Sequence, residues 1–156
     1  MMMGTALGLA GCATSPPLYR GPEVTRIQVF KGARVMQFLH HNRLLKQYSF
    51  DLGFEPVGHK IQEGDGRTPE GAYLIDRKNP NSQFHLSLGI SYPNRFDVAR
   101  ARNLGVDPGG DIFIHGTPAQ FAGKPDWTWG CIAVTNEEMD EIFPMIETGT
   151  SIVLYA

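Results

Sequence analysis

Apolar and polar positions alternate in several short stretches of this chain, a pattern typical of half-buried β-strands. The clearest stretch runs from Phe84 to Ile90, where every second side chain is apolar. Comparable patterns predict further strands at 24–30, 34–39, 44–50, 72–76, 112–114 and 152–155. The tight turn Lys31-Gly32-Ala33 follows the first of these, so the first three strands are expected to form an antiparallel meander.

Two segments carry helical signals instead. Residues 94–104 begin with Asn94, a favourable N-cap, and stop before Gly105. Residues 136–146 begin with Asn136 followed by two glutamates, which suits a helix start. The apolar side chains of this second segment recur at i, i+3, i+4 and i+7, as Met139, Ile142, Phe143 and Ile146. The pattern therefore predicts an amphipathic helix that faces a core.

Composition agrees with one soluble domain. The chain has 156 residues, of which 42% are hydrophobic and 19% charged, enough to bury a real core. Eighteen glycines and eleven prolines favour a turn-rich, strand-dominated fold over a helical bundle. The formal net charge of −2, without a cluster of Lys and Arg, argues against a nucleic-acid partner. We predict a mostly β fold over residues 24–156: a single compact domain, a mixed β-sheet or sandwich, with one or two helices.

The N-terminal segment has the character of a signal peptide. Residues 1–11 are apolar or small, too few to span a bilayer but sufficient for a signal-peptide core. The ending Leu9-Ala10-Gly11-Cys12 resembles the lipobox of bacterial lipoproteins, which implies cleavage before Cys12 and acylation of that cysteine. Residues 12–23 would then be the lipidated N-terminus and a proline-containing tether. No Lys or Arg precedes the apolar stretch, so an atypical signal, a true start further upstream and an unprocessed tail stay open.

Cys131 is the second cysteine and the principal candidate for chemistry. With Cys12 acylated, Cys131 would have no disulfide partner in an oxidising compartment, where an unused thiol is a liability. Sixteen positions earlier, His115 ends the apolar stretch 112–114. A thiolate–imidazole pair is the minimum equipment for covalent acyl transfer. The spacing alone is a weak signal, because an internal cysteine is more often a buried small apolar residue.

The glycines beside these two residues fit the same chemistry. Gly116 follows His115 and leaves a backbone carbonyl free to orient the imidazole, which we expect to accept and donate the proton. The backbone N–H groups around Gly130 and Cys131 are candidate donors to an oxyanion. No two of the five histidines stand at a spacing typical of metal ligands, so we expect neither a metal nor another cofactor.

Several ordered blocks together resemble the L,D-transpeptidase catalytic (YkuD-type) domain family over about residues 24–156. They are Ile114-His115-Gly116, the stretch Trp129-Gly130-Cys131-Ile132-Ala133-Val134-Thr135-Asn136, and the upstream stretches 64–73, 85–94 and 108–111. The resemblance implies that Cys131 is the nucleophile and His115 the base. It also implies peptidoglycan stem peptides and an amine acceptor as partners, at the periplasmic face of a bacterial envelope.

The chain departs from the family pattern at two positions beside the nucleophile. Trp129 stands where the usual motif has a histidine, and Ala133 where many members have an arginine. An indole N–H only donates, so Trp129 can line the groove but cannot act as a base. Trp129 and Asn136 are expected to contact substrate. Arg67 is expected to pair with a substrate carboxylate, although solvated loop charges are the commoner outcome.

The resemblance favours an envelope-anchored cysteine acyltransferase that works through a Cys131 acyl-enzyme, in L,D-transpeptidation. Two alternatives stay open. One is a hydrolase that trims stem peptides or releases a lipoprotein attached to peptidoglycan. The other is a non-catalytic lipoprotein that binds the cell wall and keeps Cys131 buried.

Overall fold

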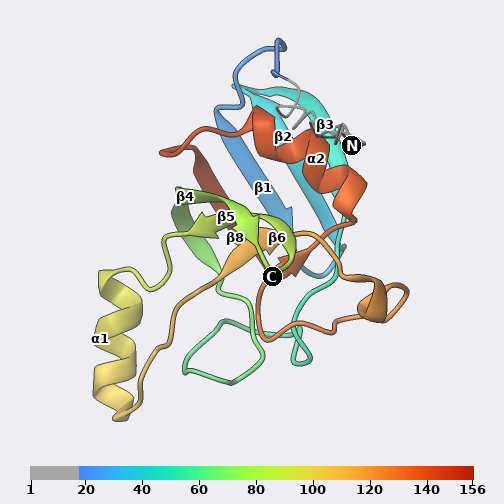
Figure 1. Ribbon diagram of the computed structural model, residues 1–156. Helices are drawn as coiled ribbons and strands as arrows, with labels where there is room; N and C mark the ends of the chain where they lie inside the picture. Colours follow the sequence, from blue (N-terminus) through green and yellow to red (C-terminus); the bar gives the residue numbers. More distant parts are fainter. Residues whose placement is uncertain (1–17) are drawn as a thin grey trace, which may run out of the picture.

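The computed structural model describes residues 18–156 as one curled mixed sheet with two α-helices (Figure 1). The proposed signal peptide and Cys12 lie outside the described residues. The strands are β1 (Arg26–Phe30), β2 (Val35–His40), β3 (Arg43–Ser49), β4 (Gly71–Ser82), β5 (His85–Ile90), β6 (Phe113–His115), β7 (Ile132–Ala133) and β8 (Ser151–Tyr155). The helices are α1 (Arg95–Leu104) and α2 (Asn136–Met145), with a 3-10 turn η1 (Ala119–Phe121).

The strand order is β3-β2-β1-β8-β4-β5-β6-β7, and only the pairs β1–β8 and β6–β7 are parallel. The mostly β fold class and the antiparallel meander of β1 to β3 are confirmed. Beyond β3 the chain returns to the opposite end of the sheet. Asp51 and Ala133 exchange two backbone hydrogen bonds of 2.9 Å, which join the segment after β3 to β7. This bridge brings the two ends of the strand order together and curls the sheet on itself.

The core lies inside this curl and under α2. Alternate side chains of the central strands point inward, and Ile27, Val29, Met36, Phe38 and Ile152 are fully buried. From α2, Met139 and Ile142 join the same cluster, as the helical period predicts. Burying each of these side chains contributes about 1.5–3 kcal/mol. Packing of this inner face therefore holds the sheet in its curled form.

The N-cap of α2 lies one residue earlier than the sequence indicated. Thr135, not Asn136, is the N-cap: its hydroxyl accepts from the Glu138 N–H, and the Glu138 carboxylate accepts from the Thr135 N–H. Asn136 is the first helical residue, which leaves its side chain free for another contact. Pro144 lies in the last turn, and the helix ends one residue later at Met145.

Two strands differ from the sequence prediction. β4 spans twelve residues instead of the expected five, because its second half continues the ladder to β5 through backbone pairing with irregular register. Its polar side chains from Asp76 onward carry no alternation that could reveal it. β7 has two residues, too few for any periodicity, and exists because β6 lies beside it.

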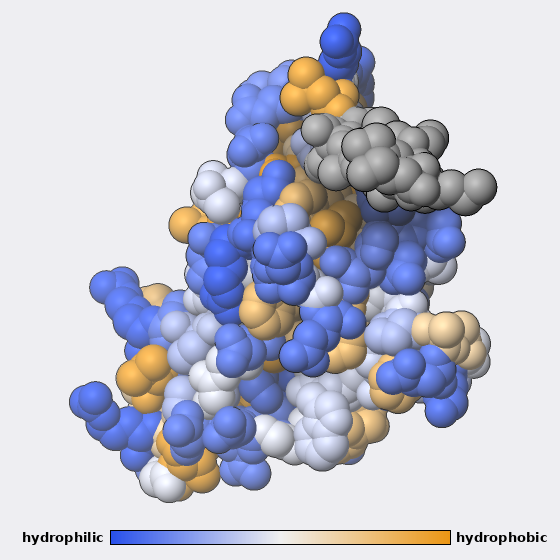
Figure 2. All heavy atoms as spheres, viewed as in Figure 1, coloured by the Kyte–Doolittle hydropathy of each residue, from blue (hydrophilic) through white to orange (hydrophobic). Residues whose placement is uncertain are grey.

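α1 stands away from the sheet at the lower left of Figure 1. Asn94 caps it and Gly105 ends it in the left-handed conformation, as predicted. The buried Asp97 ties the helix to β4 by accepting from the Tyr73 hydroxyl at 2.8 Å. Figure 2 shows a mainly hydrophilic face with scattered apolar side chains. Within residues 18–156, no helix combines the length and the apolar composition needed to cross a membrane.

Candidate active site

Cys131 and His115 reach the same place because β6 and β7 are parallel neighbours. His115 is the last residue of β6 and pairs in register with Ala133, while Cys131 immediately precedes β7. Both side chains line one cavity of about 360 Å³, together with Asn79, Ser82, Gln83, Phe84, Ser87, Asp111 and Phe113. Cys131 is partly exposed, and its Sγ lies 3.4 Å from the Asp111 carbonyl oxygen. The structure thus brings together the two residues on which the sequence argument depended.

The turn before Cys131 requires glycine. Gly130 has φ +123°, and a Cβ there would lie 2.4 Å from the Arg67 carbonyl oxygen. The Thr68 hydroxyl donates to the Gly130 carbonyl at 2.7 Å. Thr128 closes the turn, because its hydroxyl accepts from the Gly130 N–H at 3.1 Å and donates to the Cys131 carbonyl at 2.8 Å. The Gly130 N–H, which the sequence suggested as an oxyanion donor, is therefore already engaged by Thr128.

The orientation of His115 follows from one hydrogen bond. Its Nδ1 lies 2.7 Å from the Gly116 carbonyl oxygen. A carbonyl can only accept, so in the neutral ring Nδ1 carries the proton and Nε2 keeps the lone pair. Gly116 also admits a close neighbour, since a Cβ there would lie 2.3 Å from Asn136 Oδ1. The imidazole is held as the tautomer that can accept a proton through Nε2.

Aromatic side chains fix the plane of the imidazole. Phe84 stacks on His115 with ring centroids 4.5 Å apart, and Trp127 tilts against it at 5.7 Å. Phe121, from η1, stacks on Trp127 at 4.2 Å. This packing leaves His115 only 3% exposed. The ring is rigid and largely shielded from water, apart from the side that faces the cavity.

A second cavity, of about 330 Å³, also borders Cys131. Its wall includes Lys60, Gly110 and Trp129. Trp129 is 70% exposed and meets Phe54 edge to face at 4.9 Å. Lys60 is buried and bonds the Asp65 carboxylate at 2.9 Å. The nucleophile thus lies where two hollows meet, one beside the imidazole and one beside an exposed aromatic pair.

Burial sets the protonation of the pair. It raises the pKa of the Cys131 thiol to about 11, against a smaller lowering by a hydrogen bond from the Phe113 backbone. Burial also lowers the pKa of His115, and the bond to the Gly116 carbonyl opposes this only in part. At neutral pH both groups are therefore uncharged. The expected resting thiolate–imidazole pair is thus corrected to a thiol beside a neutral imidazole.

We expect alkylation of Cys131 by iodoacetamide to need unusually high pH. Only the thiolate reacts, and a pKa near 11 keeps its population small at pH 8. The rate, followed by mass spectrometry of the peptide that contains Cys131, should still be rising at pH 10. A plateau below pH 8.5, the range of a free thiol, would contradict this resting state.

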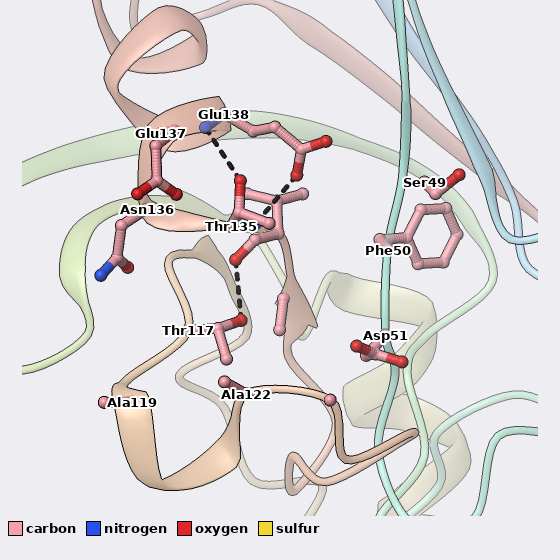
Figure 3. A pocket seen from close by; sticks show the side chains of 13 residues that line it. Ser49, Phe50, Asp51, Thr117, Ala119, Ala122, Thr135, Asn136, Glu137 and Glu138 are labelled. Atoms are coloured by element: carbon pink, nitrogen blue, oxygen red, sulfur yellow. Dashed lines mark hydrogen bonds between the residues drawn. The ribbon is translucent and has the colours of Figure 1, made fainter.

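Two residues predicted to contact substrate lie outside both cavities beside Cys131. Asn136 points against Gly116 and lines a third pocket of about 530 Å³, with Asp51, Thr117 and Glu137 (Figure 3). The Arg67 side chain lines a further pocket, with His59 and Arg100. Trp129 is the one member of the predicted substrate-binding set that shares a cavity with Cys131.

Sequence reasoning missed the residues that support the site. Thr128 and Thr68 hold the turn of the nucleophile, and Phe84 stacks on the imidazole. A threonine two residues before a glycine is a recognisable turn signal for Thr128. Nothing in the sequence marks Phe84, which stands 31 positions before its partner His115 and meets it through the pairing of β5 with β6.

Comparisons with known proteins agree on one family. Residues 24–154 match the model of the YkuD family, described as the L,D-transpeptidase catalytic domain. The chain is 29% identical over 126 residues to the protein named "Putative L,D-transpeptidase YafK" of Escherichia coli (strain K12), which covers 77% of this chain and 46% of that protein. The chain therefore spans less than half the length of this curated relative.

Solved structures share the fold. The helical cell shape determining protein Pgp2 from Campylobacter jejuni superposes with a TM-score of 0.66 at 23% identity, covering 87% of this chain and 49% of that chain. An L,D-transpeptidase from Mycobacterium smegmatis gives a TM-score of 0.57 at 13% identity, covering 85% of this chain and 59% of that one. These likenesses show the curled mixed sheet with its two helices.

Proposed function

This chain belongs to the L,D-transpeptidase catalytic domain family, and from that premise we propose that it is a cysteine acyltransferase acting on peptidoglycan stem peptides in the bacterial cell envelope. One observation carries the proposal. Cys131 and His115 line the same cavity, with the imidazole held so that Nε2 can accept a proton. Phe84 and Trp127 keep that ring in place, which lets it serve the same sulfur through repeated proton transfers.

In the first half-reaction, the Cys131 sulfur attacks the carbonyl carbon of the amide that precedes a terminal D-residue. The thiol proton passes to His115 Nε2, so charge develops only as the substrate reacts. The amide C–N bond breaks, and the leaving amine takes the proton back from His115. A thioester on Cys131 remains.

The oxyanion of this step needs backbone donors. Because Thr128 engages the Gly130 N–H, the Cys131 N–H becomes the donor that we propose for the oxyanion. The Thr128 hydroxyl, which donates to the Cys131 carbonyl, fixes the peptide plane on the other side of the residue. Removing one such donor commonly costs about 10²–10³ in rate.

In the second half-reaction, an acceptor amine attacks the thioester and gives a proton to His115. The C–S bond breaks and Cys131 recovers the proton as a thiol. The product is a new amide, which joins two stem peptides or attaches a protein. The two hollows that meet at Cys131 offer separate approaches for the departing and the arriving amine.

Hydrolysis is the second candidate, with water in place of the acceptor amine. Trp129 is the reason to keep hydrolysis as a candidate, because an exposed indole stands where the family's usual motif has a histidine. The same acyl-enzyme would then release a shortened stem peptide or free a lipoprotein from its link to peptidoglycan. The third reading, a non-catalytic binder, requires a sealed and unreactive sulfur. The raised pKa of the Cys131 thiol fits that reading, whereas its partial exposure to two cavities speaks against it.

One incubation tests the proposal and separates transfer from hydrolysis. The full chain is mixed with a defined disaccharide-tetrapeptide, with and without an added amine acceptor, and the products are identified by mass spectrometry. Transfer predicts an adduct that joins donor and acceptor and depends on the amine. Hydrolysis predicts only the peptide shortened by its D-residue, and an unchanged substrate in both arms would overturn both enzyme proposals.

We further propose that residues 1–11 act as a lipoprotein signal and that Cys12 carries the lipid anchor at the periplasmic face. The lipobox-like sequence before Cys12 supports this. Labelling cells with a fatty-acid analogue tests it: the label should be incorporated in the native chain and lost in Cys12→Ala.

A further inference from the structure

A charged pocket lies beside the turn that carries Cys131 without including the nucleophile. It encloses about 400 Å³ and is lined by His59, Ile61, Arg67, Glu70 and Arg100. Four buried side-chain atoms in residues 18–156 have no hydrogen-bond partner, and two of these, Arg67 Nε and His59 Nε2, belong to this pocket. His59 Nε2 has the Asp97 carboxylate at 3.1 Å, but Arg67 Nε has no such neighbour among these residues. An unpaired buried polar atom is costly, so Arg67 beside this hollow indicates a missing ligand.

The backbone of Arg67 is held by contacts with its neighbours, whereas its guanidinium has no partner within residues 18–156. Its N–H donates to Asp65 Oδ1 at 3.0 Å, and its carbonyl contacts the Gly130 backbone so closely that no Cβ fits there. Among the described residues, its side chain forms neither a hydrogen bond nor an ion pair. A guanidinium offers five N–H donors in a planar fork that matches a carboxylate. Arg67 therefore brings an unused fork to this pocket from a backbone that is held in place.

His59 adds a neutral donor. Its Nδ1 accepts from the Glu70 N–H at 2.9 Å, so in the neutral ring the proton is on Nε2. Burial, and then the charge of Arg100, lower the pKa of His59, which keeps the ring neutral at pH 7. Nε2 lies 3.1 Å from Asp97 Oδ1, so this N–H already faces the buried Asp97 carboxylate.

The charges around the pocket leave an excess of one positive charge. Glu70 is matched by the buried Lys31 at 2.9 Å, while Arg100 reaches Asp97 only at 3.9 Å and is half exposed. Three cations thus face two carboxylates. Burial chiefly lowers the pKa of Lys31, the bond to Glu70 opposes this, and the charges of Arg34 and then Arg67 lower it further. A singly charged anion would bring the net charge of the pocket to zero, whereas a doubly charged phosphate would make it negative.

We infer that this pocket binds a carboxylate of the acyl-donor peptide, with Arg67 as a bidentate donor and Arg100 as a second positive charge. The inference rests on the proposed function. Lys60 lines the cavity of Cys131 and the next residue, Ile61, lines this pocket, so one stretch of chain forms a wall of both. A peptide whose scissile carbonyl lies at Cys131 can place a carboxylate further along that wall.

A double-mutant cycle tests the pairing. The full chain bearing Cys131→Ala is titrated calorimetrically with a stem tetrapeptide, and with the same peptide after amidation of each carboxylate in turn. Arg67→Gln should weaken binding of the free peptide about tenfold or more, as expected for loss of a charge-assisted pair. Amidation of one particular carboxylate should cause the same loss, and the two changes combined should cost no more than either alone.

Further variants serve as controls for the double-mutant cycle. Arg67→Lys keeps the charge but loses the fork, and should bind more weakly than the parent protein; it replaces Arg67→Gln should that variant not fold. Arg43→Gln changes an exposed arginine of β3 that lines none of these pockets, and should leave affinity unchanged. Losses from amidation and from Arg67→Gln that simply add for every carboxylate would overturn the inference. So would micromolar binding of inorganic phosphate that Arg67→Gln abolishes while leaving peptide affinity intact.

Failure of this inference is separate from failure of the proposed function. The function depends on acylation of Cys131 in the native chain, whereas the cycle measures binding alone to a chain that lacks the sulfur. If the native chain is active but the losses in the double-mutant cycle simply add, only the carboxylate site is rejected.

Discussion

Replacing Cys131 with Ala is expected to abolish covalent capture of a carbapenem and to lower turnover of stem peptides by at least ~10³-fold. Under the proposed function, the Cys131 sulfur opens the β-lactam ring and keeps the whole molecule as a thioester, so the native chain should gain the full mass of the compound. Without the sulfur no other described cysteine can form this bond. Intact-protein mass spectrometry checks the result.

Two further variants serve as controls for this experiment. Cys12→Ser removes the other cysteine of the chain and should still give the full adduct. His115→Asn retains the sulfur and should slow adduct formation steeply, since nothing then accepts the proton of a thiol whose pKa is about 11. An adduct that persists in Cys131→Ala would reject the assigned nucleophile.

Replacing Gly130 with Ala disrupts the turn of the nucleophile and lowers the free energy of unfolding by about 3 kcal/mol. An alanine here must adopt φ +123°, which side chains disfavour. Its Cβ would lie 2.4 Å from the Arg67 carbonyl oxygen, a backbone atom that cannot rotate away. We expect the hydrogen bonds of Thr68 and Thr128 to this turn to break. Chemical denaturation measures the loss of stability, and adduct formation measures the displacement of the sulfur.

Gly149→Ala is the matched control. Gly149 also has a positive φ, +94°, but no atom lies within 4 Å of the position that a Cβ would occupy. It should lose only about 1 kcal/mol, the cost of the backbone conformation, and should keep its reactivity toward a carbapenem. Equal losses in the two variants would show that the contact with Arg67 contributes nothing.

The sequence predicted what depends on local pattern. The meander and both helices follow from alternation and capping residues. The resemblance to a known family, and not the spacing, suggested that His115 and Cys131 act together, and the two residues line one cavity. What it could not predict depends on the neighbours that each residue meets in three dimensions. Gly130 seemed a free oxyanion donor, because the bond from its N–H to Thr128 exists only once the turn has closed.

Arg67 and Asn136 illustrate the same limit. Both stand in motif-like stretches, and the sequence grouped both with the substrate contacts of Cys131. Their side chains leave that site because Arg67 enters the pocket of His59, and because capping by Thr135 turns Asn136 toward Gly116. The resting protonation of the pair was likewise hidden, since it depends on how deeply each group is buried.

The bridge between Asp51 and Ala133 has a consequence for the behaviour of the chain in a crowded compartment. A terminal strand with unpaired amides invites a second chain to add to it, and β7, only two residues long, would be such a terminus. The bridge occupies the outward-facing N–H and carbonyl of Ala133, two residues after Cys131. This end of the sheet is thereby protected against strand addition, and a variant that breaks the bridge should form oligomers before it unfolds.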